Sequence, residues 1–304
     1  MLYPDFNDLI ALGDQKLNIT HPSCRSVKST VLGNHRSSFR GVGLEFDSVR
    51  EYVLGDDIRN IDWRVTARTG TAHLKILKEE RERHVVLCID MNATMRFGTK
   101  GTFKSVQAAR VAAILGWGAI ARQDRVSVCF FGDVPGGIQF FAPKRTRKSF
   151  CSVLKKLTLP PIETHKISVE APLRYINQLV HTGSLVYVIS DFMDIDKGFR
   201  QEACLSRISK KCDIVFVGIN DVTDKLIHPM GVVGFQANSL GKVSVNTENL
   251  VGQKAYAHLW QEHQEKLQDI TSRFKIPLLE LMTDSKVHKD LILGLKKIAS
   301  RKKI

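Results

Sequence analysis

The sequence has little of what marks several common classes of protein. Its six cysteines are scattered and form no CxxC pair or metal-finger spacing, which disfavours a zinc finger or a disulfide framework. No apolar run approaches the roughly 18 residues that a membrane span needs. The N-terminal stretch MLYPDFNDLIALGDQ carries acidic residues where a signal peptide would be basic and then apolar. We therefore expect a cytoplasmic protein with no transmembrane segment, whose cysteines are reduced thiols packed as small core residues.

Motifs of standard catalysis are also missing. The chain contains no GxSxG and no HExxH, and no cysteine stands beside a histidine in a recognisable catalytic context. The stretch FGTKGTFKS at 97–105 falls between a predicted strand and a predicted helix, but its second glycine does not directly precede the lysine as a phosphate loop requires. The sequence therefore favours a protein that is not an enzyme and binds no nucleotide at this loop.

Positive charge is in excess. Lysine and arginine number 45 against 31 aspartates and glutamates, which gives a formal net charge of +14. The excess is concentrated at 143–148, at 154–156 and in the C-terminal LKKIASRKKI. Such patches can attract nucleic acid, anionic lipid or an acidic protein face. No aromatic residues interleave with these charges, so the pattern favours a solvated surface over a nucleic-acid site.

From residue 85 onward, apolar strand-like runs alternate with helix-like segments. The predicted strands cover 84–90, 124–133, 137–144, 184–194, 212–219 and 276–282. The predicted helices cover 103–123, 145–157, 169–181, 196–209, 251–273 and 285–299, with a hairpin at 232–247. Strands that alternate with crossover helices predict an α/β fold with a doubly wound, mostly parallel sheet covered on both faces.

Residues 1–84 do not show this alternation of strands and helices. They hold short extended pieces at 39–46 and 72–80 around a dense polar block at 49–70. This segment is too short and too polar to form an independent core. We expect a small N-terminal subdomain, 1–84, that contains β-structure and packs on a main domain formed by 85–304.

Oxygen-bearing side chains follow one predicted strand at every second position. In VVLCIDMNATMRFGT (85–99) these are Asp90, Asn92 and Thr94, and Asp191 ends the strand-like run SLVYVIS in the same way. Alternate side chains of an extended segment point the same way, and ligands bind at the carboxyl ends of strands in a doubly wound sheet. If the two strands are neighbours, this all-oxygen set suits Mg²⁺ or Mn²⁺. The alternative is that the side chains only cap the following helix and satisfy loop backbone groups.

The polar block at 49–70 is the densest constellation of charge in the chain. Three arginines face three aspartates, with two aromatic residues between them. The residues are Arg50, Tyr52, Asp56, Asp57, Arg59, Asp62, Trp63 and Arg68. Because these charges nearly neutralise one another, the block predicts a structural ion-pair network, and an interaction surface is the alternative.

These two blocks carry a resemblance to a known family. The run GVGLEFDSVREYVLGDDIRNIDWRVTARTGTAHLKILKEERERHVVLCIDMNATMRFGT, followed by FKS, resembles the MoxR-associated proteins catalogued as a domain of unknown function, number fifty-eight. The likeness is tight from about 36 to 133 and looser over most of the chain. It implies a Rossmann-like domain of the von Willebrand factor A type. It also implies a MoxR-type AAA+ ATPase as partner and a chaperone-like role in assembling other protein complexes.

The resemblance also implies a metal-ion-dependent adhesion site. Such sites have the form DxSxS, with a distant threonine and a distant aspartate. In this sequence Asp90, Asn92 and Thr94 match the first element, with Asn92 in place of a serine, and Asp191 matches the distant aspartate. The loop THKISVEAPL contains no clear match to the distant threonine, and Thr164 and Ser168 are its candidates.

Three functions remain open from the sequence. The first is a non-enzymatic module that uses the Asp90 crevice to grip an acidic side chain of an unknown client protein. The second is a binder of nucleic acid or an anionic surface through 143–156 and the C-terminus. The third is a metal-dependent phosphoester hydrolase that uses Asp90 and Asp191.

Overall fold

The computed structural model describes residues 3–14, 43–80, 83–161, 165–195, 202–237 and 241–301. The chain divides into two compact units, one formed by residues 1–27 with 83–304 and the other by residues 28–82. We call them the α/β unit and the hairpin unit.

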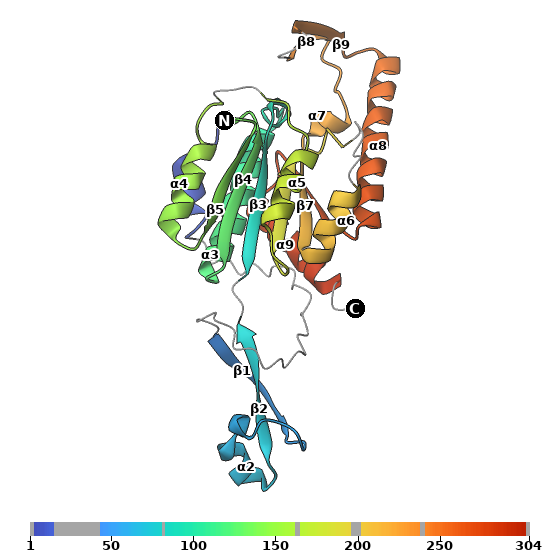
Figure 1. The fold of residues 1–304 in the computed structure, drawn as a ribbon. Coiled ribbons are helices and arrows are strands. Elements are labelled where there is room, and N and C mark those ends of the chain that lie inside the picture. Colours follow the sequence, from blue (N-terminus) through green and yellow to red (C-terminus); the bar gives the residue numbers. More distant parts are fainter. Residues whose placement is uncertain are drawn as a thin grey trace. The chain divides into compact units, whose positions relative to one another are not determined.

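A mostly parallel sheet forms the centre of the α/β unit (Figure 1). Its strand order is β10-β7-β6-β3-β4-β5, and only β5 runs antiparallel to its neighbour. The strands are β3 (His84–Met91), β4 (Arg125–Gly132), β5 (Ile138–Lys144), β6 (Leu185–Ser190), β7 (Asp213–Asn220) and β10 (Leu278–Met282). The predicted fold class, a doubly wound and mostly parallel α/β sheet, is confirmed.

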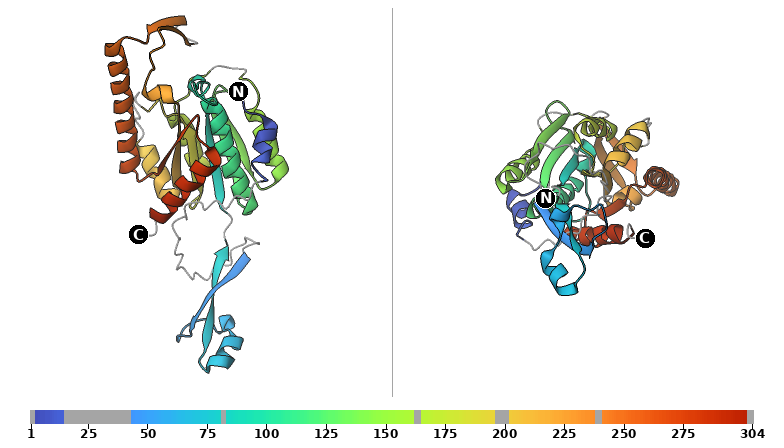
Figure 2. Two further views of the ribbon diagram at one scale, coloured as in Figure 1. Left: turned by 180° about the vertical axis from the view of Figure 1, so that it is seen from behind. Right: turned by 60° about the horizontal axis from the view of Figure 1, so that its bottom comes forward.

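Helices cover both faces of this sheet (Figures 1 and 2). One face packs against α1 (Phe6–Ala11), α3 (Lys104–Ala121), α4 (Arg147–Leu157) and α9 (Val287–Arg301). The other packs against α5 (Glu170–Leu179), α6 (Glu202–Lys211) and α8 (Leu250–Arg273). In β3, Val85 and Leu87 enter the first core while Val86 and Cys88 enter the second, because successive side chains of a strand point to opposite faces.

Short elements complete the α/β unit. They are η2 (Ala93–Met95), α7 (Val222–Lys225) and the hairpin of β8 (Val232–Ala237) with β9 (Gly241–Asn246). None of the helices within the described residues is long and apolar enough to cross a membrane.

The structure corrects several details of the sequence prediction. The strand expected at 184–194 ends at Ser190, and Phe192 adopts a left-handed φ of 55° just beyond it. The helices α1 and α7 were not predicted. On α8, His263 is 4% exposed whereas Leu259, one helical turn before it, is 63% exposed.

The hairpin unit consists of two antiparallel strands joined by two short helices. Strand β1 (Gly43–Glu51) pairs with β2 (His73–Glu80), and η1 (Ile58–Asn60) and α2 (Trp63–Thr69) lie between them in the chain. Ile61 and Leu74 are its buried apolar residues among those whose burial is described. The packing of an N-terminal subdomain on the main domain stays a prediction.

Candidate functional site

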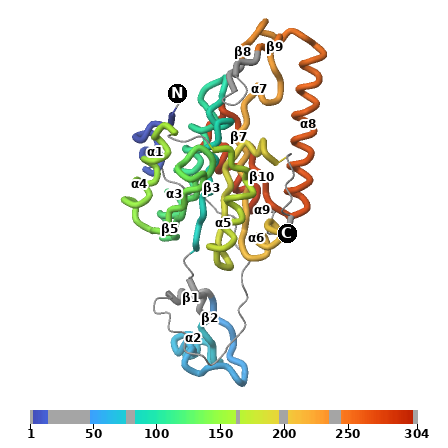
Figure 3. Tube along the Cα trace, turned by 45° about the horizontal axis from the view of Figure 1, so that its top comes forward, coloured from blue at the N-terminus to red at the C-terminus, as the bar shows by residue number. Residues whose placement is uncertain are grey.

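The strands that carry Asp90 and Asp191 are neighbours in the sheet. Strand β3 pairs in parallel with β6, with Ile89 opposite Ile189. Strands β4 and β5 follow β3 on one side, whereas β6, β7 and β10 lie on the other. The two aspartates therefore end adjacent strands at the point where strand order reverses, which is where doubly wound sheets bind ligands. Figure 3 shows this carboxyl edge tipped forward, with α7 beside it.

Asp90 is buried and already well hydrogen-bonded. Its Oδ2 accepts from Ser190 Oγ at 2.6 Å, and its Oδ1 accepts from Asn92 N at 2.8 Å and Asn92 Nδ2 at 2.7 Å. Burial and then the charge of Asp191 raise the pKa of Asp90 well above its usual range, against these hydrogen bonds. The carboxyl is thus held in a fixed orientation inside the protein.

The Asn92 side chain contacts both Asp90 and the loop before α5. The Asn92 amide joins β3 to the loop before α5, because its Oδ1 accepts from Ile167 N at 3.1 Å and its Nδ2 donates to Ile167 O at 2.9 Å. A Cβ at Gly132 would lie 2.6 Å from Asn92 N, so only glycine fits beside this residue. Thr94 lies in η2 and is exposed.

Of the two candidates for the distant threonine, the structure describes only Ser168. Ser168 Oγ accepts from Glu170 N at 3.3 Å, close to the start of α5. Thr164 lies outside the described residues.

Asp191 is paired with a buried lysine. The ammonium nitrogen of Lys104 lies 3.4 Å from Asp191 Oδ2 and 2.7 Å from Asp224 Oδ2. Lys104 and Asp191 are 2% and 3% exposed. A positive charge of the protein's own therefore stands between the two acids.

Two further strand ends carry aspartates that sequence reasoning missed. Asp133 follows β4, where its Oδ2 pairs with Arg96 at 2.5 Å and its Oδ1 accepts from His165 N at 2.8 Å. Asp221 follows β7. The signal was the same as for Asp90, an aspartate directly after an apolar strand in FFGD and GIND.

Asp221 gathers three threonine hydroxyls. Its Oδ1 accepts from Thr99 and Thr223, each at 2.5 Å, and its Oδ2 accepts from Thr283 at 2.6 Å. Although burial favours the neutral acid, hydrogen bonds from Thr223, Thr283 and Thr99 hold the pKa of Asp221 well below its usual range. The loop at 97–105 is therefore anchored by Asp221 to the ends of β7 and β10.

The fit of a divalent ion to this edge follows from these contacts. Mg²⁺ requires about six oxygen ligands in near-octahedral geometry. Both oxygens of Asp90 and the amide oxygen of Asn92 accept hydrogen bonds from the protein, and Thr94 lies exposed in η2. In the part of the chain that the structure describes, no group of three or more His, Cys, Asp or Glu residues is arranged to hold a metal. As arranged, these residues do not fit the ion, so no step of the function is routed through it.

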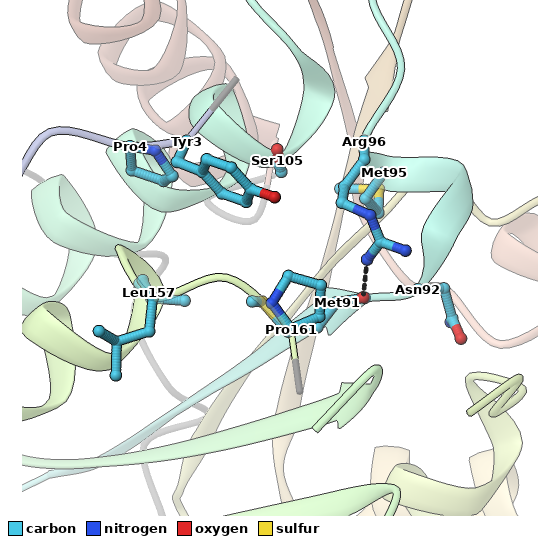
Figure 4. Close-up of a pocket in the computed structure, with 10 residues that line it drawn as sticks. Tyr3, Pro4, Met91, Asn92, Met95, Arg96, Ser105, Leu157 and Pro161 are labelled. Carbon is cyan, nitrogen blue, oxygen red and sulfur yellow. Dashed lines mark hydrogen bonds between the residues drawn. The ribbon is translucent and has the colours of Figure 1, made fainter. Parts of the chain in front are cut away.

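A small pocket lies beside the crevice and is mainly apolar (Figure 4). It is lined by Tyr3, Pro4, Met91, Asn92, Met95, Arg96, Ser105, Leu157, Leu159 and Pro161. The Arg96 guanidinium lies 3.4 Å from the Met91 carbonyl oxygen, drawn as a dashed line in Figure 4. Asp90 is not among the lining residues, so the pocket does not open onto the buried carboxyl.

Among the described residues of the polar block, one pair is bidentate. Arg50 binds Asp56 through two nitrogens at 2.7 Å each, and this hydrogen bonding lowers the pKa of Asp56. Asp57 instead caps η1, and Asp62 caps α2. Asp62 Oδ2 also lies 3.9 Å from Lys75 Nζ. Within the described residues, Arg59 and Arg68 form no ion pair.

The basic segment 143–156 lies on β5 and α4. Lys144, Lys148 and Lys155 are exposed. Arg147 lies 3.2 Å from Asp14 and stacks over the Trp117 ring, so part of this charge serves to attach the N-terminal segment to α3 and α4.

The fold and the site define a class of protein: a doubly wound α/β domain with a row of buried aspartates at its carboxyl edge. More particularly, the chain belongs to the family described as "Protein of unknown function DUF58", which matches residues 48–266. This confirms the family resemblance drawn from the sequence. The chain is 24% identical over 274 residues to the uncharacterized proteins Rv1480 of Mycobacterium tuberculosis (strain ATCC 25618 / H37Rv) and Mb1516 of Mycobacterium bovis. These alignments cover 89% of this chain and 84% of each relative.

Solved structures of low sequence identity are also similar. The conserved hypothetical protein BatB from Bacteroides thetaiotaomicron has a TM-score of 0.46 at 13% identity, over 72% of this chain and 99% of that one. An aerotolerance-related membrane protein from Bacteroides fragilis has a TM-score of 0.42 at 11% identity, with the same coverage. With scores below 0.5, neither structure informs what this chain does.

Proposed function

We propose that the protein is a non-enzymatic interaction module of the von Willebrand factor A type that helps a MoxR-type AAA+ ATPase to assemble or activate other protein complexes. The observation that carries this proposal is an exposed apolar surface on the hairpin unit, which we call the tip surface. It consists of Val53, Leu54, Ile58 and Trp63.

The tip surface is unusual for a protein exterior. Leu54 is 97% exposed and Trp63 is 69% exposed, and Val53 and Ile58 are also largely open. Scattered apolar residues are normal on a surface, but four large exposed ones within residues 53–63 support a site of interaction. Tryptophan and arginine are among the residue types enriched where binding energy is concentrated.

The charges around the tip surface indicate its partner. Arg59, Arg64 and Arg68 are exposed, whereas Asp56 and Asp62 are engaged within the unit by Arg50 and by the start of α2. Among the residues that the structure describes, these arginines have no ion-pair partner, so we propose that they contact another molecule. A protein face that combines acidic and apolar side chains is complementary to this surface.

The Asp90 crevice is the second contact that the family resemblance implies. In an adhesion-type site, Mg²⁺ or Mn²⁺ at Asp90, Asn92, Thr94 and Asp191 would bind a client carboxylate. The hydrogen bonds on Asp90 and Asn92 and the pairing of Asp191 with Lys104 would all have to open first. The proposal therefore rests on the tip surface rather than on the ion.

A pull-down with a purified MoxR-type ATPase tests the proposal. The double variant Leu54→Ser, Trp63→Ala should reduce retention at least about 30-fold, because losing one interface hot spot costs about 2 kcal/mol. Leu259→Ser on α8 is the matched control, since Leu259 is also exposed, at 63%, but lies outside the tip surface. Circular dichroism should show both variants folded.

Three results would contradict the proposal. Unchanged retention of the ATPase by the double variant would show that the tip surface does not bind it. Failure of the wild-type protein to retain the ATPase at all would remove the ATPase as partner. Turnover of a generic phosphoester by the wild-type protein, lost in Asp90→Ala, would instead indicate a hydrolase.

A further inference from the structure

Three acids and one lysine meet at the switch point of the sheet. Asp90, Asp191 and Asp224 are each less than 10% exposed, and Lys104 is 2% exposed. They come from four separate segments: the ends of β3 and β6, the short helix α7 and the start of α3. Buried charges of this kind are stable only when they are paired.

We infer that the ammonium group of Lys104 is the resident cation of this crevice and occupies the role that a divalent ion has in an adhesion-type site. The crevice is then complete without metal. The inference is independent of the tip surface and of its partner.

The contacts of Lys104 support this role. Its Nζ lies 2.7 Å from Asp224 Oδ2 and 3.4 Å from Asp191 Oδ2, so one cation bridges the acids that follow β7 and β6. Asp224 also accepts from Asp221 N at 2.7 Å. The lysine thereby ties α3 to the ends of both strands.

The position of Lys104 in its helix gives a second argument. It is the first residue of α3, where the helix dipole disfavours a positive charge. Lysine at this place is therefore not explained by helix stability. It is explained by the two carboxylates that its ammonium group bridges.

The hydrogen bonds of Asp90 and Asn92 also support a crevice that needs no metal ion. Asp90 is satisfied by Ser190 and Asn92, and the Asn92 oxygen accepts from Ile167 N. A divalent ion placed between Asp90 and Asp191 would face the ammonium group directly and would be repelled by it. Only removal of the lysine charge would leave acids in need of a cation.

Metal-dependent thermal stability of the full-length chain tests the inference. The melting temperature of the wild type should be the same, within about 1 °C, in EDTA and in millimolar Mg²⁺ or Mn²⁺, because no site takes up the ion. Lys104→Ser should melt at a lower temperature in EDTA and regain about 3–8 °C in Mn²⁺. Lys100→Ser is the matched control, since Lys100 lies four residues before Lys104 in the chain but its side chain is 72% exposed.

Each result has a defined meaning. A metal-induced shift in the wild type that disappears in Asp90→Ala would overturn the inference, and so would a Lys104→Ser protein as stable in EDTA as the wild type. A Lys104→Ser protein that is destabilised without a metal response supports Lys104 as the counter-ion, provided that the wild type also shows no response. If Lys104→Ser does not fold, calorimetric titration of the wild type with Mn²⁺ tests the inference instead. Stoichiometric binding of Mn²⁺ would contradict it, and no binding would support it.

Discussion

Asn92 connects two parts of the carboxyl edge through one side chain. Its amide donates to Asp90 and to the Ile167 carbonyl and accepts from Ile167 N. A serine at this position would be too short to make all three bonds. The asparagine that departs from the DxSxS pattern is thus a structural link between β3 and the loop before α5.

Replacing Asn92 by alanine should therefore destabilise the protein. The change leaves the partly buried Ile167 N without its acceptor and the buried Asp90 with fewer donors. It should lower the free energy of unfolding by about 2–4 kcal/mol. Urea unfolding measures it. Thr94→Ala is the control in the same motif, and because Thr94 is exposed its effect should stay within about 0.5 kcal/mol. Equal effects of the two changes would contradict this account of the site.

The lowered pKa of Asp221 predicts how its contribution to the stability of the fold changes with pH. Its pKa is lowered in the folded protein, so its charge stabilises the fold above the pKa of the unfolded chain, about 3.9. That stabilisation is lost as the pH falls toward the folded pKa. The difference in stability between wild type and Asp221→Asn should accordingly be largest near neutral pH and shrink between about pH 4 and pH 2. A difference that does not change with pH over this range would contradict the lowered pKa.

At the scale of elements, the packing of α3 against α4 depends on a glycine. A Cβ at Gly116 would lie 2.0 Å from Phe150 Cζ, and the Phe150 ring is held edge-on to Trp117 with 4.9 Å between centroids. The ring is buried and cannot easily move. The glycine therefore sets how closely the two helices approach.

Glycine-to-alanine changes in two helices should have opposite signs for this reason. Gly116→Ala should destabilise the protein by about 1–3 kcal/mol through overpacking. Gly252→Ala, at the start of α8, has no atom nearer than 3.8 Å to the new Cβ and should be neutral or stabilise by up to about 1 kcal/mol. Thermal unfolding of the two variants compares them, and a stable Gly116→Ala would show that α3 and α4 can separate.

The elements themselves were largely predictable. Strands β3, β6 and β7 are continuous apolar runs, and such runs are typical of strands buried on both faces. The residues missed were those whose structure depends on short polar segments. Asp5 caps the six-residue helix α1, and Asp221 with Asp224 forms a capping box on the four-residue helix α7, which are signals too local to stand out in the sequence.

At the scale of the whole molecule, the two units differ in their internal support. The six-stranded sheet has an apolar core on each face, whereas the hairpin unit has a two-stranded sheet. An isolated two-stranded hairpin is only marginally stable in water. The free energy of local unfolding should therefore be lower for the hairpin unit than for the α/β unit.

Hydrogen exchange should resolve this difference. Backbone amides of β3, β6 and β7 should exchange at the rate set by global unfolding, and amides of β1 and β2 should exchange at least about 100-fold faster. The measurement is made by mass spectrometry on the full-length chain. Equal protection in both sheets would show that the hairpin unit is stabilised by contacts beyond its own residues.

The sequence by itself determined the order and type of the main elements, the family, and the places where Asp90 and Asp191 end their strands, because hydrophobic periodicity and strand-end residues are local properties. Only the tertiary structure decided which charges meet. The order of strands in the sheet brings Lys104 to Asp191 and Asp224, and it brings Asp221 to Thr99 and Thr283. The partner of a buried charge depends on that order, and no local pattern in the chain encodes it.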